Sequence, residues 1–359
     1  MPMEGEKVVR VQETPLHALV EGLLRASGAD EPSAEATARA VVDASARGVD
    51  THGVRLVPRY CQAVNEGRIT QRPNVRFERL APSAGSIDAD HGFGHLASYR
   101  AVEHGVELAR ETGCAMITVK NSSHFGAAGC YARAAALQGI AAIGGAHADP
   151  FVVPHDGVKP FYSTNPLTFA TPVADAEPLL LDMATSSIPF NRVLLRRVLG
   201  ESLPPGVAVD ANGDMTTDAE AAAYLLPLGG TDYGYKGAAL AAVIDILSSA
   251  FAGMPHGNKV PGYLAHPFSE RIPVGHFFIF IDPSKFMPMP LYYAAMQAFL
   301  DDLRSQPAHP GKSVMAPGDP EIAYAAERRA NGVPVDLTTW GSFKTLAEHY
   351  GLALPETLA

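Results

Sequence analysis

The amino-acid sequence predicts an α/β body joined to a helical part that both chain ends contribute. The chain has 359 residues, of which 47% are hydrophobic and 18% charged. This is the balance of a folded protein large enough to bury a substantial core. Short β-prone runs alternate with helical segments between about residues 76 and 283, and the segments on either side are mainly helical.

The first 75 residues are predicted to be mostly helical. Thr14 and Pro15 resemble an N-cap and a first helical residue, apolar residues follow at helical spacing, and Gly28 is typical of a helix end. Ser33 can cap a second helix. The segment VPRYCQAVNEG continues the helical pattern.

The alternating middle of the chain predicts the α/β body. Helices are expected at Leu96–Thr112 and from Ala127, and the β-prone runs are GSIDAD, AMITVK, IAAIGGA, LLLDMA and HFFIFID. The apolar stretch GAALAAVIDILSSAFAGM carries Asp245 in its middle. This interruption predicts a buried helix and not a membrane span.

After Pro283 the pattern returns to helix in LYYAAMQAFLDDLRS, EIAYAAERRANG and TTWGSFKTLAEHYG. The Pro- and Gly-rich stretch from residue 307 to 320 predicts a loop over a surface or a site. We therefore expect residues 1–75 and 284–359 to pack together as the helical part, and residues 76–283 to form the body.

Charge and cysteine content exclude several classes of protein. Lys and Arg number 28 against 38 Asp and Glu, so the net charge of −10 gives no general attraction to nucleic acid or to an anionic membrane. Cys61, Cys114 and Cys130 match neither a disulfide framework nor a C-x-x-C site. The start, MPMEGEKVVRVQ, lacks the apolar core of a signal peptide. A cytoplasmic location is expected.

Gly92, Gly94 and Ala97 have the G-x-G-x-x-A spacing of a Rossmann turn. The next predicted strand, however, ends in Lys120 where that motif needs an acid for the ribose, so we expect a plain glycine turn. His91 and His95 are four apart, but glycines lie between them and no third ligand is in view. No metal site is predicted.

Two segments carry a histidine where proton transfer would need one. In RGVDTHGVRL, His52 can exchange a proton with a carbonyl oxygen and a nearby arginine can clamp a carboxylate; alternatively, both satisfy the end of a helix. In SSHFGAAG, His124 precedes a predicted helix start whose free N–H groups favour an anion or a carbonyl oxygen; alternatively, it caps a tight turn.

Two further segments can serve a nucleotide. Ser163, Thr164, Asn165 and Asp182 end apolar strands and can bond a nucleotide or simply form turns. Lys236 lies in a glycine-rich loop before the most apolar helix, where a cation opposes the helix dipole unless a phosphate or carboxylate is near. The P-loop pattern is absent.

In this order, the segments resemble the malate/L-lactate dehydrogenase family of NAD(P)-dependent oxidoreductases, which lacks a Rossmann fold. The resemblance covers nearly the whole chain, and its marks are RGVDTHG, SSHFGAAG, TNPLTFATP, LDMATS, GVAVDANGDMTTD with LLPLGG, and GYKG. It implies a mixed-sheet body that binds NAD or NADP, a homodimer with sites near the subunit interface, and hydride transfer to a small 2-oxo acid or from a 2-hydroxy acid such as malate, lactate or ureidoglycolate.

The resemblance also implies roles for residues. His52, with the Thr51 hydroxyl beside it, would be the proton donor, and His124 would stand at the nicotinamide and substrate; in some relatives it is treated as the acid/base instead. The expected substrate-binding residues are Arg55, Arg59, Thr164 and Arg192. The expected dinucleotide-binding residues are His124, Asp149, Asp182, Met183, Ala184, Lys236, Gly237, Pro317, Gly318 and Asp319.

Departures from the family pattern leave alternatives open. Thr51 replaces the usual serine, and Leu56 stands where several relatives have arginine, so Arg55 or Arg59 takes the carboxylate. SIPFNRV replaces the usual glycine-lysine and brings Arg192 toward the expected pocket. The alternatives are reduction of a cyclic imine carboxylate, a metal-dependent hydrolase or lyase using the histidines, and a catalytically silent binding protein.

Overall fold

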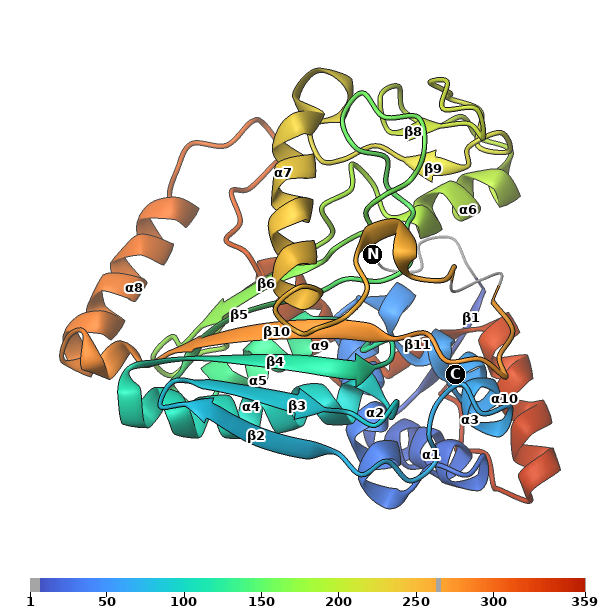
Figure 1. Ribbon diagram of the computed structural model, residues 1–359, viewed down its shortest axis with the longest axis horizontal. Coiled ribbons are helices and arrows are strands. Elements are labelled where there is room, and N and C mark those ends of the chain that lie inside the picture. The colour runs from blue at the N-terminus through green and yellow to red at the C-terminus, as the bar shows by residue number, and fades with distance from the viewer. Residues whose placement is uncertain (1–6, 263–265, 359) are drawn as a thin grey trace.

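A mixed sheet forms the centre of the protein in the computed structural model, which describes residues 7–262 and 266–358 (Figure 1). Within these residues the sheet has seven strands in the order β2-β3-β4-β10-β5-β6-β7, and β3 and β4 are its one parallel pair. Residues 1–6, which begin the segment without signal-peptide character, lie outside this description. The strands are Arg76–Ala81 (β2), Ala84–Asp88 (β3), Cys114–Ser122 (β4), Val274–Ile281 (β10), Ala141–Ala146 (β5), Leu167–Thr171 (β6) and Leu179–Met183 (β7).

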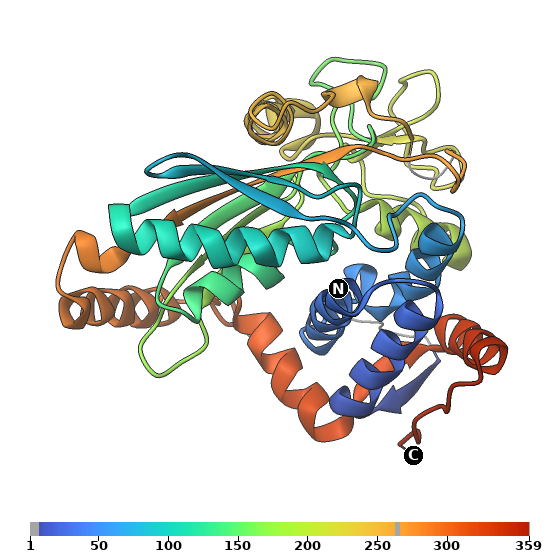
Figure 2. The same cartoon turned by 60° about the horizontal axis from the view of Figure 1, so that its bottom comes forward.

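Helices cover both faces of the sheet, as its most apolar strand requires. Phe277, Phe278 and Phe280 on β10 are fully buried although they point to opposite faces. The helices α4 (Gly94–Thr112) and α5 (Gly129–Ala136) lie on one face, and α7 (Gly230–Ser248) lies on the other (Figure 2). The sequence prediction of an α/β body is confirmed, with a mixed sheet.

The helix α7 differs from its prediction as a buried helix. Ala241, Ile244 and Asp245 are buried on its inner face, whereas Val243 and Ile246 on the outer face are each 52% exposed. The helix is apolar on all sides but packs on the sheet with only one of them.

The helical part is built from segments at both chain ends. The helix α1 packs against α2, α3 and α10, while α2 contacts α9. Leu16, Leu23, Trp340 and Phe343 share their core. These helices are Glu13–Ala26 (α1), Glu31–Ala46 (α2), Val57–Asn65 (α3), Asp319–Asn331 (α9) and Leu337–Tyr350 (α10). In contrast, α8 (Met289–Arg304) stands apart from them, beside the far end of the sheet, although residues 284–359 were expected to pack as one part (Figure 1).

Local details correct two predicted caps and add short strands. Asp30, and not Ser33, caps α2: its carboxylate accepts the Ser33 N–H at 3.1 Å. The helix α1 begins at Glu13, so Thr14 is inside it. The strands β1 (Val8–Val11) and β11 (Val333–Asp336) pair antiparallel and join the chain ends. Four residues are too few for an alternating pattern, which is why neither strand was expected.

A smaller lobe lies above the sheet and contains α6 (Phe190–Leu199) and the strand pair β8 (Ala208–Val209) and β9 (Tyr224–Leu225) (Figure 1). It has its own small apolar core. Among the described helices, none combines the length and apolarity needed to cross a membrane.

Candidate active site

The structure brings His52 and His124 together from distant parts of the chain. Their rings are stacked, with centroids 5.9 Å apart and an angle of 15° between the planes. His52 ends a short 3-10 turn, Asp50–His52, between α2 and α3, and His124 follows the end of β4. Both side chains are half-buried.

A buried ion pair anchors the turn that carries His52. Asp50 is 2% exposed and accepts two hydrogen bonds from the Arg328 guanidinium of α9, at 2.6 and 2.9 Å. Arg328 also donates to the Ser45 carbonyl at the end of α2. The His52 turn is therefore held by both chain ends.

The loop that carries His124 is held by α4 and β10. A Cβ atom at Gly94 would lie 2.3 Å from the Ser123 carbonyl oxygen, and the Gly94 N–H donates to the Ser123 hydroxyl at 3.1 Å. The ring of Phe125 stacks on His276 at 4.5 Å. The glycines of the G-x-G-x-x-A segment thus let α4 begin against the His124 loop, and the predicted glycine turn takes this form.

A hydroxyl group lies at Nδ1 of each histidine. Thr51 Oγ1 is 2.9 Å from His52 Nδ1, and the Tyr60 hydroxyl is 2.7 Å from His124 Nδ1. Tyr60 lies on α3 and is 1% exposed. Sequence reasoning treated it only as part of a helical segment; the signal that could have found it is its position on the helix directly after the His52 turn.

Burial shifts the pKa of both histidines downward. It lowers the pKa of His52 to about 4. For His124, burial followed by the neighbouring His52 and Arg59 lowers the pKa to about 3. Both side chains nevertheless keep some exposure to solvent. Both imidazoles are neutral near pH 7 in the unliganded protein.

The two candidate arginines face different partners. Arg55 Nε lies 3.2 Å from Asp336 Oδ2, and Asp336 caps α10 by accepting the Thr339 N–H. Arg59, in contrast, is close enough to His124 to lower its pKa. Its guanidinium lies 5.1 Å from the Phe268 ring centroid.

The other two residues expected to bind substrate lie elsewhere. Arg192 is half-buried on α6, in the smaller lobe. The Thr164 carbonyl accepts the N–H of Thr185 at 2.9 Å and its hydroxyl at 3.0 Å. This places Thr164 beside the end of β7.

Asp182, Met183 and Ala184 lie at that end of β7, which is tied to the His124 segment. Asp182 Oδ2 accepts the Gly129 N–H at 2.8 Å, at the start of α5. The helix start that was expected to attract a ligand anion therefore already holds a carboxylate. Burial, with a smaller effect of Glu321, raises the pKa of Asp182 to about 6. The side chain is nevertheless exposed to solvent.

Lys236 lies in the second turn of α7 and not in a loop before it, because the helix already begins at Gly230. Its ammonium is 5.3 Å from the Tyr233 ring centroid. Gly237 contacts the backbone of Leu228, whose N–H donates to the Thr185 carbonyl at 2.8 Å. Lys236 and Gly237 are thus linked to the end of β7.

The remaining expected cofactor residues surround β7 and β5. The Pro317 carbonyl accepts the Leu180 N–H at 3.3 Å, Gly318 lies against Leu180, and Asp319 is paired with Arg304. Asp149 is buried in the loop after β5.

Ser163 and Asn165 are buried and bonded within the protein. The Ser163 hydroxyl accepts the Ala148 N–H at 3.1 Å, and the Asn165 amide donates to the Ala241 carbonyl at 3.0 Å. They hold loops in place and have little left to offer a nucleotide.

Glycines in the segment after His124 allow close packing against neighbouring side chains. A Cβ atom at Gly126 would lie 3.0 Å from His95 Nε2, and one at Gly129 would lie 3.0 Å from Asp182 Oδ2. Both glycines therefore let the backbone pass close to these side chains, which a larger residue at either position would push away. Within the described ranges, no three His, Cys, Asp or Glu side chains gather as metal ligands.

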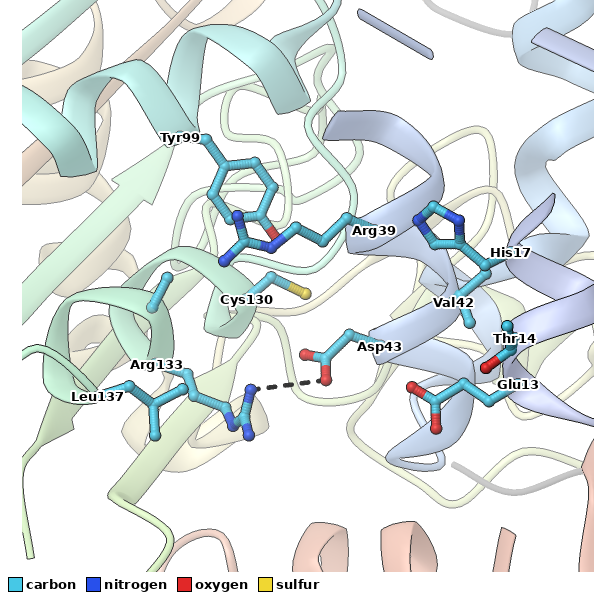
Figure 3. A pocket seen from close by; sticks show the side chains of 11 residues that line it. Glu13, Thr14, His17, Arg39, Val42, Asp43, Tyr99, Cys130, Arg133 and Leu137 are labelled. Carbon is cyan, nitrogen blue, oxygen red and sulfur yellow. Dashed lines mark ion pairs between the residues drawn. The ribbon is translucent and has the colours of Figure 1, made fainter. Parts of the chain in front are cut away.

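A separate cavity of about 310 Å³ lies between α1, α2, α4 and α5 (Figure 3). Two of its charged groups are paired: Arg133 pairs with Glu177 at 2.8 Å and with Asp43 at 3.6 Å. It is lined by none of the residues predicted for the site. The histidine pair, and not this cavity, is where the predicted site residues come together.

Comparison with known proteins gives matches over nearly the whole chain. A family model described as malate/L-lactate dehydrogenase matches residues 11–344. The malate dehydrogenase of Pyrococcus abyssi is 31% identical over 354 residues, covering 97% of this chain and 96% of the relative. The L-sulfolactate dehydrogenase of Methanothermobacter thermautotrophicus is 34% identical over 320 residues, covering 89% and 90%. The solved malate dehydrogenase of Entamoeba histolytica is 28% identical with a TM-score of 0.91, covering 98% and 100%.

Other relatives differ in the cofactor or substrate that their names give. They include a ureidoglycolate dehydrogenase (NAD(+)) of Escherichia coli and a (2R)-3-sulfolactate dehydrogenase (NADP(+)) of Chromohalobacter salexigens. The solved Δ1-piperideine-2-carboxylate reductase of Pseudomonas syringae has a TM-score of 0.85 at 26% identity.

Fold, histidine pair and relatives define the class of this protein as an oxidoreductase of the NAD(P)-dependent 2-hydroxyacid dehydrogenase type. The chain belongs to the malate/L-lactate dehydrogenase family.

Proposed function

We propose that this enzyme interconverts a small 2-oxo acid and the corresponding 2-hydroxy acid, with His52 as the acid/base and Arg59 as the carboxylate clamp. The carrying observation is the stacked pair of His52 and His124, tied through Gly129 and Asp182 to the end of β7. This arrangement places two groups capable of proton transfer on a segment that is joined to the end of β7, where the cofactor residues are expected.

The bound dinucleotide supplies the hydride for the carbonyl carbon. His52 gives a proton to the carbonyl oxygen and regains one from solvent. An imidazole with a pKa of about 4 is a poor proton donor in the unliganded protein. A substrate carboxylate close by favours the charged imidazolium and raises this pKa toward neutrality, so the substrate itself prepares its proton donor.

Arg59 is the better clamp of the two arginines. Arg55 is held in an ion pair by Asp336, and releasing it would leave a nearly buried carboxylate unpaired. Arg59 lies on the His124 side of α3, where its charge reaches the site. A planar guanidinium can hold a carboxylate with two parallel hydrogen bonds.

The end of β7 is the proposed dinucleotide site. Asp182, Met183 and Ala184 would contact the nucleotide from the strand, with Lys236 and Gly237 beside them and the 317–319 loop along the strand edge. Asp149 would contribute from the loop after β5. Relatives named for NAD(+) and for NADP(+) both occur, so both cofactors belong in the test.

The test is the loss of reduced-nicotinamide absorbance with NADH and NADPH separately, against malate- and lactate-type 2-oxo acids and a cyclic imine carboxylate. We expect turnover on a 2-oxo acid. His52→Ala should lower kcat by roughly 10²–10⁴-fold, the range for a lost general acid, with dinucleotide binding retained. Unchanged turnover in His52→Ala would remove His52 from its role.

Reduction of a cyclic imine carboxylate is the second candidate, because the piperideine-2-carboxylate reductase shares this fold over 94% of the chain. There, the imine nitrogen takes the proton in place of the carbonyl oxygen. Turnover of the imine with none of any 2-oxo acid would select it.

A further inference from the structure

The two histidines of the site differ in what their Nδ1 atoms can do. His124 Nδ1 receives the backbone N–H of Gly126 at 3.3 Å and lies 2.7 Å from the Tyr60 hydroxyl. A backbone N–H can only donate, so this long contact forms only while the nitrogen carries a lone pair and no proton, and the shorter contact from the Tyr60 hydroxyl adds to that preference. In a neutral imidazole the proton is then on Nε2.

The surroundings of His52 do not fix which ring nitrogen carries the proton. Its Nδ1 faces the Thr51 hydroxyl at 2.9 Å, which can turn to donate or to accept. His52 can therefore be neutral in either tautomer or charged with its partner still bonded. Of the two rings, only His52 is free to gain and lose a proton without breaking its Nδ1 contact.

We propose that Tyr60, together with the Gly126 N–H, locks His124 in the Nε2–H form, so that His124 serves as a fixed hydrogen-bond donor to the substrate oxygen while His52 alone exchanges the proton. This rests on the proposed function. In the reduction, hydride adds to the carbonyl carbon, the C=O π pair moves to oxygen, His52 supplies the proton to that oxygen, and His124 keeps its own.

Tyr60 is a positioning residue in this scheme. Its ring is buried against His95, with centroids 5.0 Å apart, so the hydroxyl has a fixed place. Of the two groups at His124 Nδ1, the Tyr60 hydroxyl is the stronger donor, because its contact of 2.7 Å is shorter than the 3.3 Å contact of the Gly126 N–H. Protonating His124 at Nδ1 would set an N–H against the Gly126 N–H, which burial makes costly. The low pKa of His124 agrees with a ring that stays neutral.

The first test is NMR of the unliganded enzyme with isotope-labelled histidine, His124 being assigned by its loss in His124→Gln. We expect Nδ1 unprotonated and Nε2 protonated from about pH 8 to pH 5. A proton on Nδ1, or protonation of the ring within that range, would overturn the proposal. Because the NMR measurement needs no substrate, its result tests the tautomer of His124 independently of the proposed reaction.

The second test uses Tyr60→Phe, which keeps the ring and removes the hydroxyl. We expect kcat to fall by roughly 10- to 100-fold, as for one lost oriented hydrogen bond, with a mixed His124 tautomer by NMR. The matched control is Tyr350→Phe, whose hydroxyl bonds Ser27 and Asn65 away from the site. Wild-type kcat and an unchanged tautomer in Tyr60→Phe would show that Tyr60 does not determine the tautomer of His124.

The third test separates donation from proton exchange. The glutamine amide N–H can replace Nε2–H but cannot exchange a proton at neutral pH. His124→Gln should therefore be at least about tenfold more active than His124→Ala, whereas His52→Gln should be no better than His52→Ala. Equal loss in both His124 variants would make His124 an acid/base and refute the division of roles.

Discussion

Arg55 and Arg59 are separated by one helical turn and yet have different environments. Residue type alone left both as candidates for the substrate clamp. The structure separates them because Asp336, more than 270 residues further along the chain, pairs with Arg55. No pattern within a single sequence reveals a partner at that distance.

The clamp can be tested with a pair of variants. Arg59→Ala should raise KM for the 2-oxo acid by roughly 10- to 100-fold, since a charge-assisted pair is lost, and leave cofactor binding nearly unchanged. Arg59→Lys should recover only part of the lost affinity for the 2-oxo acid, because lysine lacks the planar guanidinium that makes two parallel hydrogen bonds. The measurement is steady-state kinetics at saturating cofactor.

Arg55→Ala is the matched control for this pair. It should lower stability through the loss of Asp336 pairing while KM changes little. A large rise in KM for Arg55→Ala with none for Arg59→Ala would exchange the two assignments.

At the level of elements, the sequence predicted the α/β body, the helices that became α4, α9 and α10, and the run that became β10, because each has a long and regular apolar pattern. The α7 helix was found as well, but its start was placed too late, since the glycines before Lys236 look like a loop. The strands β1 and β11 were missed because tertiary pairing, not local propensity, makes them strands.

The site was predicted less evenly. The sequence pointed to His52, Thr51 and His124, which the structure brings together, because polar groups stood at the ends of apolar elements. Tyr60 was missed because a tyrosine in an amphipathic helix is ordinarily core. Its importance depends on the direction of one hydroxyl, which only the packing of α3 against the His124 loop determines.

The start of α4 at Gly94 can be tested for its role in holding the His124 loop. Gly94→Ala would place a Cβ atom 2.3 Å from the Ser123 carbonyl and 2.9 Å from that of His124. We expect the His124 loop to shift, with a loss of about 1–3 kcal/mol in unfolding free energy from overpacking and a lower kcat.

Gly341→Ala is the matched control, because it lies inside α10 with open space around it. It should raise the unfolding free energy by about 0.5–1 kcal/mol, the ordinary gain of alanine in a helix, at unchanged kcat. Denaturant titration and kinetics together give both numbers. Equal behaviour of the two variants would contradict the role of Gly94.

For the molecule as a whole, buried histidines should make stability depend on pH. His276 is fully buried, and burial with the nearby His147 and His124 lowers its pKa to about 3. Its folded pKa is below the unfolded value of about 6.5, so the unfolded chain binds more protons as pH falls between these values. Stability should be highest above about pH 6.5 and decrease below it.

The expected slope for His276 alone is about 0.7 kcal/mol per pH unit at pH 6.5 and rises toward about 1.4 kcal/mol per pH unit near pH 5. Chemical denaturation at several pH values measures it, and His276→Asn should reduce the slope. A stability that stays flat over this interval would show that His276 titrates normally in the folded protein.

Exposed apolar side chains on the outer face of α7 and on α8 indicate that a second copy of the chain covers them. Val243 and Ile246 on α7 are each 52% exposed, and Leu291 and Phe299 on α8 are 63% and 56% exposed. A helix that is apolar on all sides is ordinarily covered on all sides. We propose that a second copy of the chain covers these faces, in the homodimer that the family resemblance implies.

Light scattering coupled to size exclusion tests the dimer. We expect a dimer for the wild type and a shift toward monomer for Ile246→Glu. Leu80→Glu is the control, because Leu80 is 60% exposed on β2, away from these helices. A monomeric wild type, or dissociation by Leu80→Glu alone, would refute this interface.

The joining of the two chain ends has a consequence for how the enzyme is made. During synthesis the His52 turn is made early. Arg328, which anchors Asp50 in that turn, is added 278 residues after Asp50. The strand β1 likewise cannot pair until β11 has been made. Until the last helices emerge, the N-terminal helices have no finished core to join, and contacts of such long range form slowly. A nascent or C-terminally truncated chain should therefore be inactive, and catalytic competence should appear only as synthesis ends.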